Sequence, residues 1–92
     1  MKLLTEDEIQ AALGRAVGWE RADAEIIKTV KLTDFAHAML YVGAVAHLAE
    51  VASHHPDIAI SWNQVTLTLS THSAGGLTEA DFLLAAQISA LP

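Results

Sequence analysis

The sequence contains no cysteine, which excludes disulfide bonds, thiolate metal sites and thiol nucleophiles. Basic residues are few: five Lys and Arg stand against eleven Asp and Glu, and the net charge of −6 repels a phosphate backbone, so we expect no direct nucleic-acid partner. The longest uninterrupted run of apolar residues and glycine, residues 38–46, is about half of what a membrane span needs. The start of the chain turns acidic at residues 6–8, unlike a secretory signal. We therefore expect a cytoplasmic protein without membrane contact.

Apolar residues, by contrast, make up 52% of the 92 residues. This supply is enough for one hydrophobic core and too small for two, so residues 1–92 are expected to form a single domain. Thr5 and Glu8 have the spacing of a capping box, and apolar residues then recur at helical intervals, which predicts a helix over 5–16. Residues 19–32 alternate and favour two strands with a turn at 22–23, although Lys28 interrupts the apolar side of the second strand.

A long helix is predicted over 34–53, with Asp34 near its start. Its apolar residues surround the helix almost completely, and one sheet can cover only one side. We therefore expect a second copy of the chain to cover the other side, with Gly43 and the alanines allowing close helix approach. His37 and His47 lie inside this helix and are expected to be packed or interfacial.

Residues 58–62 and 65–70 alternate between apolar and polar side chains, which predicts a second hairpin with Asn63-Gln64 as its turn. In that register Trp62 faces Val65, and the same spacing places His55 opposite His72.

Residues 73–76 read as a loop, and Thr78 to Asp81 again has capping-box spacing, which predicts a last helix to about Ala90. The order helix, two strands, helix, two strands, helix predicts an α+β fold, α-β-β-α-β-β-α. It has a four-stranded antiparallel sheet and helices packed on one face.

Three histidines are predicted to gather at one edge of this fold. His54 and His55 end the long helix, and His72 ends the last strand opposite them. Imidazole is present in both protonation states near neutral pH, which suits general acid and base catalysis. Glu50 lies four residues before His54, where it can orient that ring, and Asp57 lies nearby.

Other interpretations of these residues stay open at this point. A metal site is not predicted, because adjacent histidines diverge and no HExxH or two-His-one-carboxylate pattern is present. Glu50 could be a solvated break in the helix, Asp81 only the partner of its Thr cap, and Trp19 and Trp62 ordinary core anchors. From the residues alone, the prediction is a histidine-lined polar site on a small oligomeric domain.

One spaced pattern is more specific than His-His-Pro alone. It consists of Glu50, three residues, His54-His55-Pro56, five residues, Trp62, nine residues, His72, eight residues and Asp81. It resembles the signature of the pterin-4a-carbinolamine dehydratase family, and the similarity covers essentially the whole chain. The resemblance implies the same element order, and assembly into homodimers or homotetramers through the helix 34–53. It also implies a hydro-lyase that converts 4a-hydroxytetrahydropterin to quinonoid dihydropterin in tetrahydrobiopterin recycling. No metal or organic cofactor is implied, and an aromatic amino-acid hydroxylase would supply the substrate.

The resemblance also implies roles for single residues. His54 and His55 are expected to form the proton-transfer pair, His72 to bind and orient the pterin, and Glu50 to tune His54. Substrate contacts are expected from Trp19, Asp57, Ser70, Thr71 and Asp81, with Ser70 and Thr71 using hydroxyl or backbone groups. Ile58 departs from the family, which often has an aromatic residue there. The alternatives are a non-catalytic binding or dimerisation module and a relative repurposed in another pterin pathway.

Overall fold

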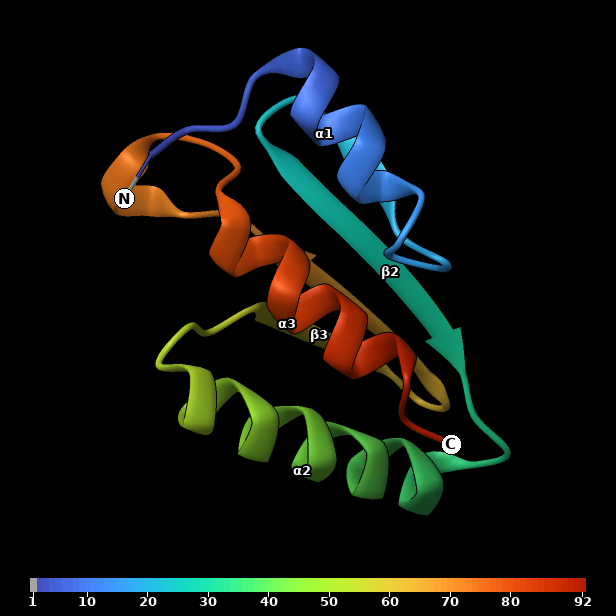
Figure 1. Cartoon of the computed structure of the whole chain (residues 1–92). Helices are drawn as coiled ribbons and strands as arrows, with labels where there is room; N and C mark the ends of the chain where they lie inside the picture. The colour runs from blue at the N-terminus through green and yellow to red at the C-terminus, as the bar shows by residue number, and fades with distance from the viewer. Residues whose placement is uncertain (1) are drawn as a thin grey trace.

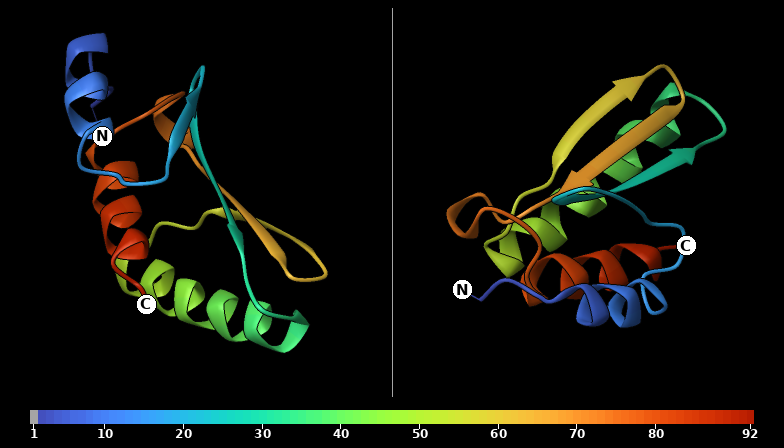
Figure 2. Two further views of the ribbon diagram at one scale, coloured as in Figure 1. Left: turned by 90° about the vertical axis from the view of Figure 1, so that its right-hand side faces the viewer. Right: turned by 90° about the horizontal axis from the view of Figure 1, so that it is seen from above.

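Three helices lie on one face of a four-stranded antiparallel sheet in the computed structural model, which describes residues 2–92 (Figures 1 and 2). The elements are α1 (Glu6–Leu13), β1 (Glu20–Ala22), β2 (Glu25–Lys31), α2 (Phe35–Ala52), β3 (Asp57–Ser61), β4 (Gln64–Leu69), the short 3-10 helix η1 (His72–Ala74) and α3 (Glu79–Ser89). This is the α+β fold, α-β-β-α-β-β-α, that the sequence predicts. The first helix is shorter than the predicted 5–16, because the chain leaves helical hydrogen bonding at Gly14.

The sheet has the strand order β1-β2-β4-β3, so β4 lies inside it and β3 forms an edge. Val65, Leu67 and Leu69 of β4 have no exposed surface, and they alternate with partly exposed threonines, as expected for a sheet with one face in the core. Lys28 pairs with Leu67 and so starts on the core face. Its ammonium leaves the core by donating to the Val17 carbonyl oxygen at 3.1 Å.

The register of the β3–β4 hairpin differs from the prediction by two residues. Ser61 pairs with Gln64, so the turn residues are Trp62 and Asn63 instead of Asn63 and Gln64. The cause is Asn63, whose Nδ2 donates to the Leu32 carbonyl at 2.9 Å and whose own carbonyl accepts from the Leu32 N–H at 2.7 Å. These bonds tie the turn to the end of β2. A shift of two preserves the face of every side chain, but the predicted pairing of Trp62 with Val65 is wrong.

The same shift removes the predicted pairing of His55 with His72. The last β3–β4 pair joins Asp57 to Thr68, and His72 lies beyond β4 in η1. Trp62 is 66% exposed with a φ of 51°, so its interpretation as a core anchor is also wrong.

Helix α2 packs on the domain through only a few of its residues, among which Ala38, Val45 and Ala49 are buried. Its large apolar side chains Phe35, Met39, Leu40 and Val51 are exposed. With 18 residues and a mean hydropathy of 1.3, α2 meets the length and composition of a membrane span, but its buried alanines and valine tie it to the core of the domain. An apolar face of α2 is thus left uncovered within one copy of the chain.

Candidate active site

The Asp81 carboxylate is the centre of a buried hydrogen-bond network. Asp81 lies in the first turn of α3 and has no exposed surface. Its Oδ2 accepts from the Thr78 N–H at 2.8 Å, which is the capping bond that the sequence predicts, and from the Thr71 hydroxyl at 2.9 Å. Its Oδ1 lies 2.6 Å from Nε2 of His54. Asp81 therefore caps the helix and also holds an imidazole, so the interpretation as a cap alone is incomplete.

His54 reaches Asp81 because of the way α2 ends. Ser53 takes a left-handed conformation with a φ of 50°, and the backbone N–H of His54 returns to the Ala49 carbonyl at 3.1 Å. The chain leaves the helical path before His54, so the predicted contact between Glu50 and His54 is wrong. Glu50 instead contacts His55, whose Nε2 lies 2.5 Å from Oε2 of Glu50.

The two adjacent histidines therefore have different environments. The His54 side chain is 15% exposed and its acid partner is fully buried. The His55 and Glu50 side chains are 62% and 77% exposed, so water surrounds that pair. Both imidazoles have a carboxylate partner, which is the arrangement that general acid and base catalysis uses to orient a histidine.

His72 lies beside an open cavity of about 440 Å³. The cavity lies between the β1–β2 hairpin and the segment that follows β4, and its lining residues are Ala22, Asp23, Ala24, Glu25, Ser70, His72 and Gly75. Thr71, which precedes His72, is hydrogen-bonded to Asp81, so His54 and the segment that carries His72 share one carboxylate. Asp81 therefore links the segments that carry His54 and His72, and the predicted strand pairing does not.

The predicted substrate-binding residues differ in their positions relative to this cavity. Ser70 lines it, but its hydroxyl donates to the Ala24 carbonyl at 2.8 Å. The hydroxyl of Thr71 is buried and donates to Asp81, its backbone N–H donates to the Gly76 carbonyl at 2.9 Å, and its carbonyl accepts from the Ala74 N–H at 3.0 Å. A contact between Thr71 and a substrate therefore stays a prediction. Asp57 is exposed at the start of β3.

Trp19 is 5% exposed and donates its indole N–H to Ser89 Oγ at 3.1 Å. Ser89 ends α3, whereas Asp81 lies in the first turn of that helix. The packing of Trp19 agrees with a core anchor, and its contact with a substrate stays a prediction.

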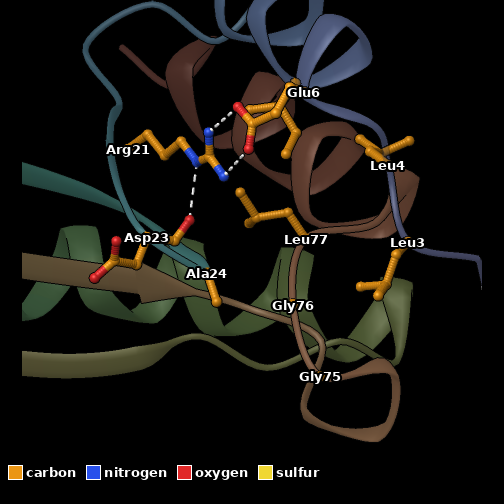
Figure 3. A pocket seen from close by; sticks show the side chains of 10 residues that line it. Leu3, Leu4, Glu6, Arg21, Asp23, Ala24, Gly75, Gly76 and Leu77 are labelled. Atoms are coloured by element: carbon orange, nitrogen blue, oxygen red, sulfur yellow. Dashed lines mark hydrogen bonds and ion pairs between the residues drawn. The ribbon is translucent and has the colours of Figure 1, made fainter.

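The sequence does not predict an ion pair that lies beside a neighbouring pocket. The guanidinium of Arg21 binds the Glu6 carboxylate at 2.5 and 2.8 Å and donates from Nε to the Asp23 carbonyl at 2.8 Å (Figure 3). The hydrogen bond from Arg21 lowers the pKa of Glu6, and Glu6 raises the pKa of Arg21. The pair joins α1 to β1 over a second pocket of about 310 Å³, which shares Asp23, Ala24 and Gly75 with the first. No local spacing signals a contact between residues so far apart in sequence.

Metal binding was the alternative use of the histidines. Within residues 2–92, no three His, Asp or Glu side chains lie close enough together to hold a metal ion. The donor set available is instead two imidazole–carboxylate pairs with one further imidazole at a cavity. That set can donate, accept and relay protons.

The fold and the site together define a small α+β domain with two histidine–carboxylate pairs and a third histidine at an open cavity. The sequence model of the family described as pterin 4 alpha carbinolamine dehydratase matches residues 2–91, and the chain belongs to this family. A protein of Roseiflexus castenholzii, provisionally named a pterin-4-alpha-carbinolamine dehydratase, is 57% identical over 86 residues, which cover 94% of this chain and 92% of the relative. A relative from Chloroflexus aurantiacus with the same provisional name is 50% identical over 88 residues, covering 96% and 95% of the two chains.

Two solved structures resemble the fold. The crystal structure of a transcriptional coactivator/pterin dehydratase from Brucella melitensis has a TM-score of 0.92 and 35% identity, and 97% of each chain is covered. A pterin dehydratase-like protein, identified as a RuBisCO assembly factor in the alpha-carboxysome, has a TM-score of 0.63 and 25% identity over 78% of this chain and 83% of that one. The solved structures that resemble this chain therefore include one described by catalysis and one described by assembly.

Proposed function

We propose that the protein is a dehydratase that removes water from 4a-hydroxytetrahydropterin and releases quinonoid dihydropterin. Family membership supports the substrate class. The observation that carries the proposal is the buried Asp81–His54 pair, hydrogen-bonded through Thr71 to the segment that places His72 at the cavity.

The reaction needs two proton movements. The 4a-hydroxyl leaves as water after it receives a proton, and N5 loses its proton as the C4a=N5 bond forms, so the two transfers balance. Both are tasks for imidazole near neutral pH, with His54 and His55 as the transferring pair and His72 as the group that orients the ring. No metal or organic cofactor enters this scheme. The expected setting is cytoplasmic recycling of tetrahydrobiopterin after an aromatic amino-acid hydroxylase.

The test is turnover of enzymatically generated 4a-hydroxytetrahydropterin, followed by its ultraviolet decay. The wild type should exceed the spontaneous rate, and His55→Ala should lose about a hundredfold of turnover, the scale of one general acid or base. His37→Ala is the matched control, because His37 is also exposed and paired with a carboxylate, Asp34 at 2.7 Å, near the other end of α2. Its turnover should equal that of the wild type. A folded wild type that does not exceed the spontaneous rate contradicts the proposal.

A binding module is the second candidate function, and the uncovered apolar face of α2 favours it. In the same region we propose contacts between copies that give a homodimer or homotetramer. The pterin dehydratase-like protein described as a RuBisCO assembly factor is an example of a similar fold named for assembly. The binding function becomes the favoured one if the turnover assay shows no acceleration.

A further inference from the structure

We infer that His54 exchanges protons with the substrate through Nδ1, with Asp81, Thr71 and Thr78 as the positioning residues that set this tautomer. The inference takes the proposed dehydration as the reaction, but its first test needs no substrate. It also divides the two proton transfers between the adjacent histidines.

The direction of each hydrogen bond around Asp81 follows from counting hydrogens. The single hydroxyl hydrogen of Thr71 points to Oδ2 of Asp81. The 2.8 Å contact between the Thr71 and Thr78 hydroxyls must therefore use the hydrogen of Thr78. With the Thr78 N–H also directed at Oδ2, this oxygen receives two donors. The carboxylate is held from one side and presents Oδ1 to His54.

The 2.6 Å contact with Oδ1 assigns the proton of neutral His54 to Nε2, because an ionised carboxylate can only accept. Nδ1 then carries the lone pair. Within residues 2–92, His54 Nδ1 has no hydrogen-bond partner, and the one buried side-chain nitrogen or oxygen atom without a partner is the Tyr41 hydroxyl oxygen. His54 Nδ1 is therefore not fully buried, although the side chain is only 15% exposed, and it is the ring nitrogen left for a ligand.

The tautomer of His55 is not fixed in this way. Its Nε2 also meets a carboxylate, that of Glu50, but both side chains are mostly exposed and water competes for every bond. Neutral His54 consequently presents a fixed proton acceptor, suited to remove the N5 proton. His55 has a mostly exposed ring and is suited to deliver a proton to the leaving hydroxyl.

The first test is the ring nitrogen spectrum of His54 in the 15N-labelled wild-type protein above pH 8, with His54→Gln used to assign the signals. The inference requires a protonated Nε2 and an unprotonated Nδ1. A His54 that is protonated on Nδ1, or that averages between the two tautomers, overturns it. His55 serves as the internal comparison and should show averaging.

Asp81→Asn is the decisive variant. The Thr71 hydroxyl and the Thr78 N–H both require an oxygen, so the amide should turn its NH2 group towards His54. His54 Nε2 must then accept, and the proton moves to Nδ1. We expect the ring spectrum to switch to the opposite tautomer and turnover to fall on the order of 10⁴-fold, the scale for a catalytic histidine held in the wrong tautomer. An unchanged tautomer in folded Asp81→Asn contradicts the inference.

A matched pair at Thr71 tests the positioning role without altering the carboxylate. Thr71→Ser keeps the hydroxyl and Thr71→Val removes it at nearly the same size. The His54 Nε2–H should exchange with water about tenfold faster in Thr71→Val and at the wild-type rate in Thr71→Ser, since one charge-assisted hydrogen bond is lost only in the first. Equal rates in both variants contradict the role of Thr71. If the tautomer is as stated and no pterin is turned over, the proposed function fails while this inference stands.

Discussion

At the scale of single residues, Asp81 joins folding to chemistry, since one buried carboxylate caps α3 and orients His54. Asp81→Ala leaves the Thr78 N–H, the Thr71 hydroxyl and the His54 ring without their acceptor. We expect the free energy of unfolding to fall by about 2–4 kcal/mol in a urea titration, the combined scale of a lost cap and unsatisfied buried donors. Asp57→Ala, an exposed acid, should change it by less than about 0.5 kcal/mol. Equal effects of the two substitutions would argue against the network.

Trp62 is strained, because its left-handed φ of 51° at the first position of a two-residue hairpin turn is a conformation that glycine adopts without cost. Its ring is 66% exposed and contributes little packing. Trp62→Gly should raise the free energy of unfolding by about 1 kcal/mol, the scale of the left-handed penalty. Chemical denaturation of the two proteins measures this. A loss of stability would show that the indole contacts outweigh the strain.

At the scale of elements, the start of α2 is sensitive to acid. Asp34 caps the helix, and its pKa is lowered first by the backbone N–H of His37 and then by the His37 ring. The pKa of Asp34 is lower in the folded protein than in the unfolded chain, where it is about 3.9. The Asp34 charge therefore contributes its full stabilisation above the unfolded pKa, and this contribution is lost as the pH falls through the pKa of the folded protein. Asp34→Asn keeps a capping oxygen and does not titrate.

The difference in Tm between the wild type and Asp34→Asn should therefore shrink as the pH falls below about 4, relative to its value at about pH 5. Thermal denaturation from pH 2.5 to pH 7 measures it. The other acidic residues are present in both proteins, so their titration contributes equally to both Tm values and does not affect the difference. A difference that does not change with pH would exclude the contribution of the Asp34 charge.

The helices were predictable because their signals are local. The capping boxes at Thr5–Glu8 and Thr78–Asp81 are both present, and α2 begins and ends within one residue of 34–53. The turn between β3 and β4 was not predictable, because Asn63 is fixed by Leu32, a residue about thirty positions away in sequence.

The site follows the same division between local and distant contacts. The sequence indicated His54, His55 and Asp81 as functional residues, but the left-handed Ser53 decides which histidine meets which acid. That conformation, in a residue other than glycine, has no signature in the spacing.

At the scale of the whole molecule, the exposed face of α2 predicts self-association. Leu40 and Val51 are 72% and 74% exposed, and they lie three turns apart on the same side of the helix. Light scattering at micromolar concentration should give the wild type a multiple of 9.8 kDa, and Leu40→Glu should lower this mass because a carboxylate is costly to bury.

Leu83→Glu is the control for this prediction, since Leu83 is 59% exposed on α3 and lines a small pocket with Ala12 of α1. Its mass should equal that of the wild type. A wild type with the mass of a monomer would contradict the proposed assembly.

The double task of Asp81 also bears on how the family diverges. A descendant that abandons dehydration for an assembly role still needs its last helix capped, so purifying selection on stability retains the aspartate long after selection on turnover has ceased. The histidine opposite it caps no helix and only donates to Oδ1 of that carboxylate, so selection on stability constrains it less. In comparing such descendants, loss of the residue at position 54 is therefore the informative sign of lost catalysis, and retention of the one at position 81 is not.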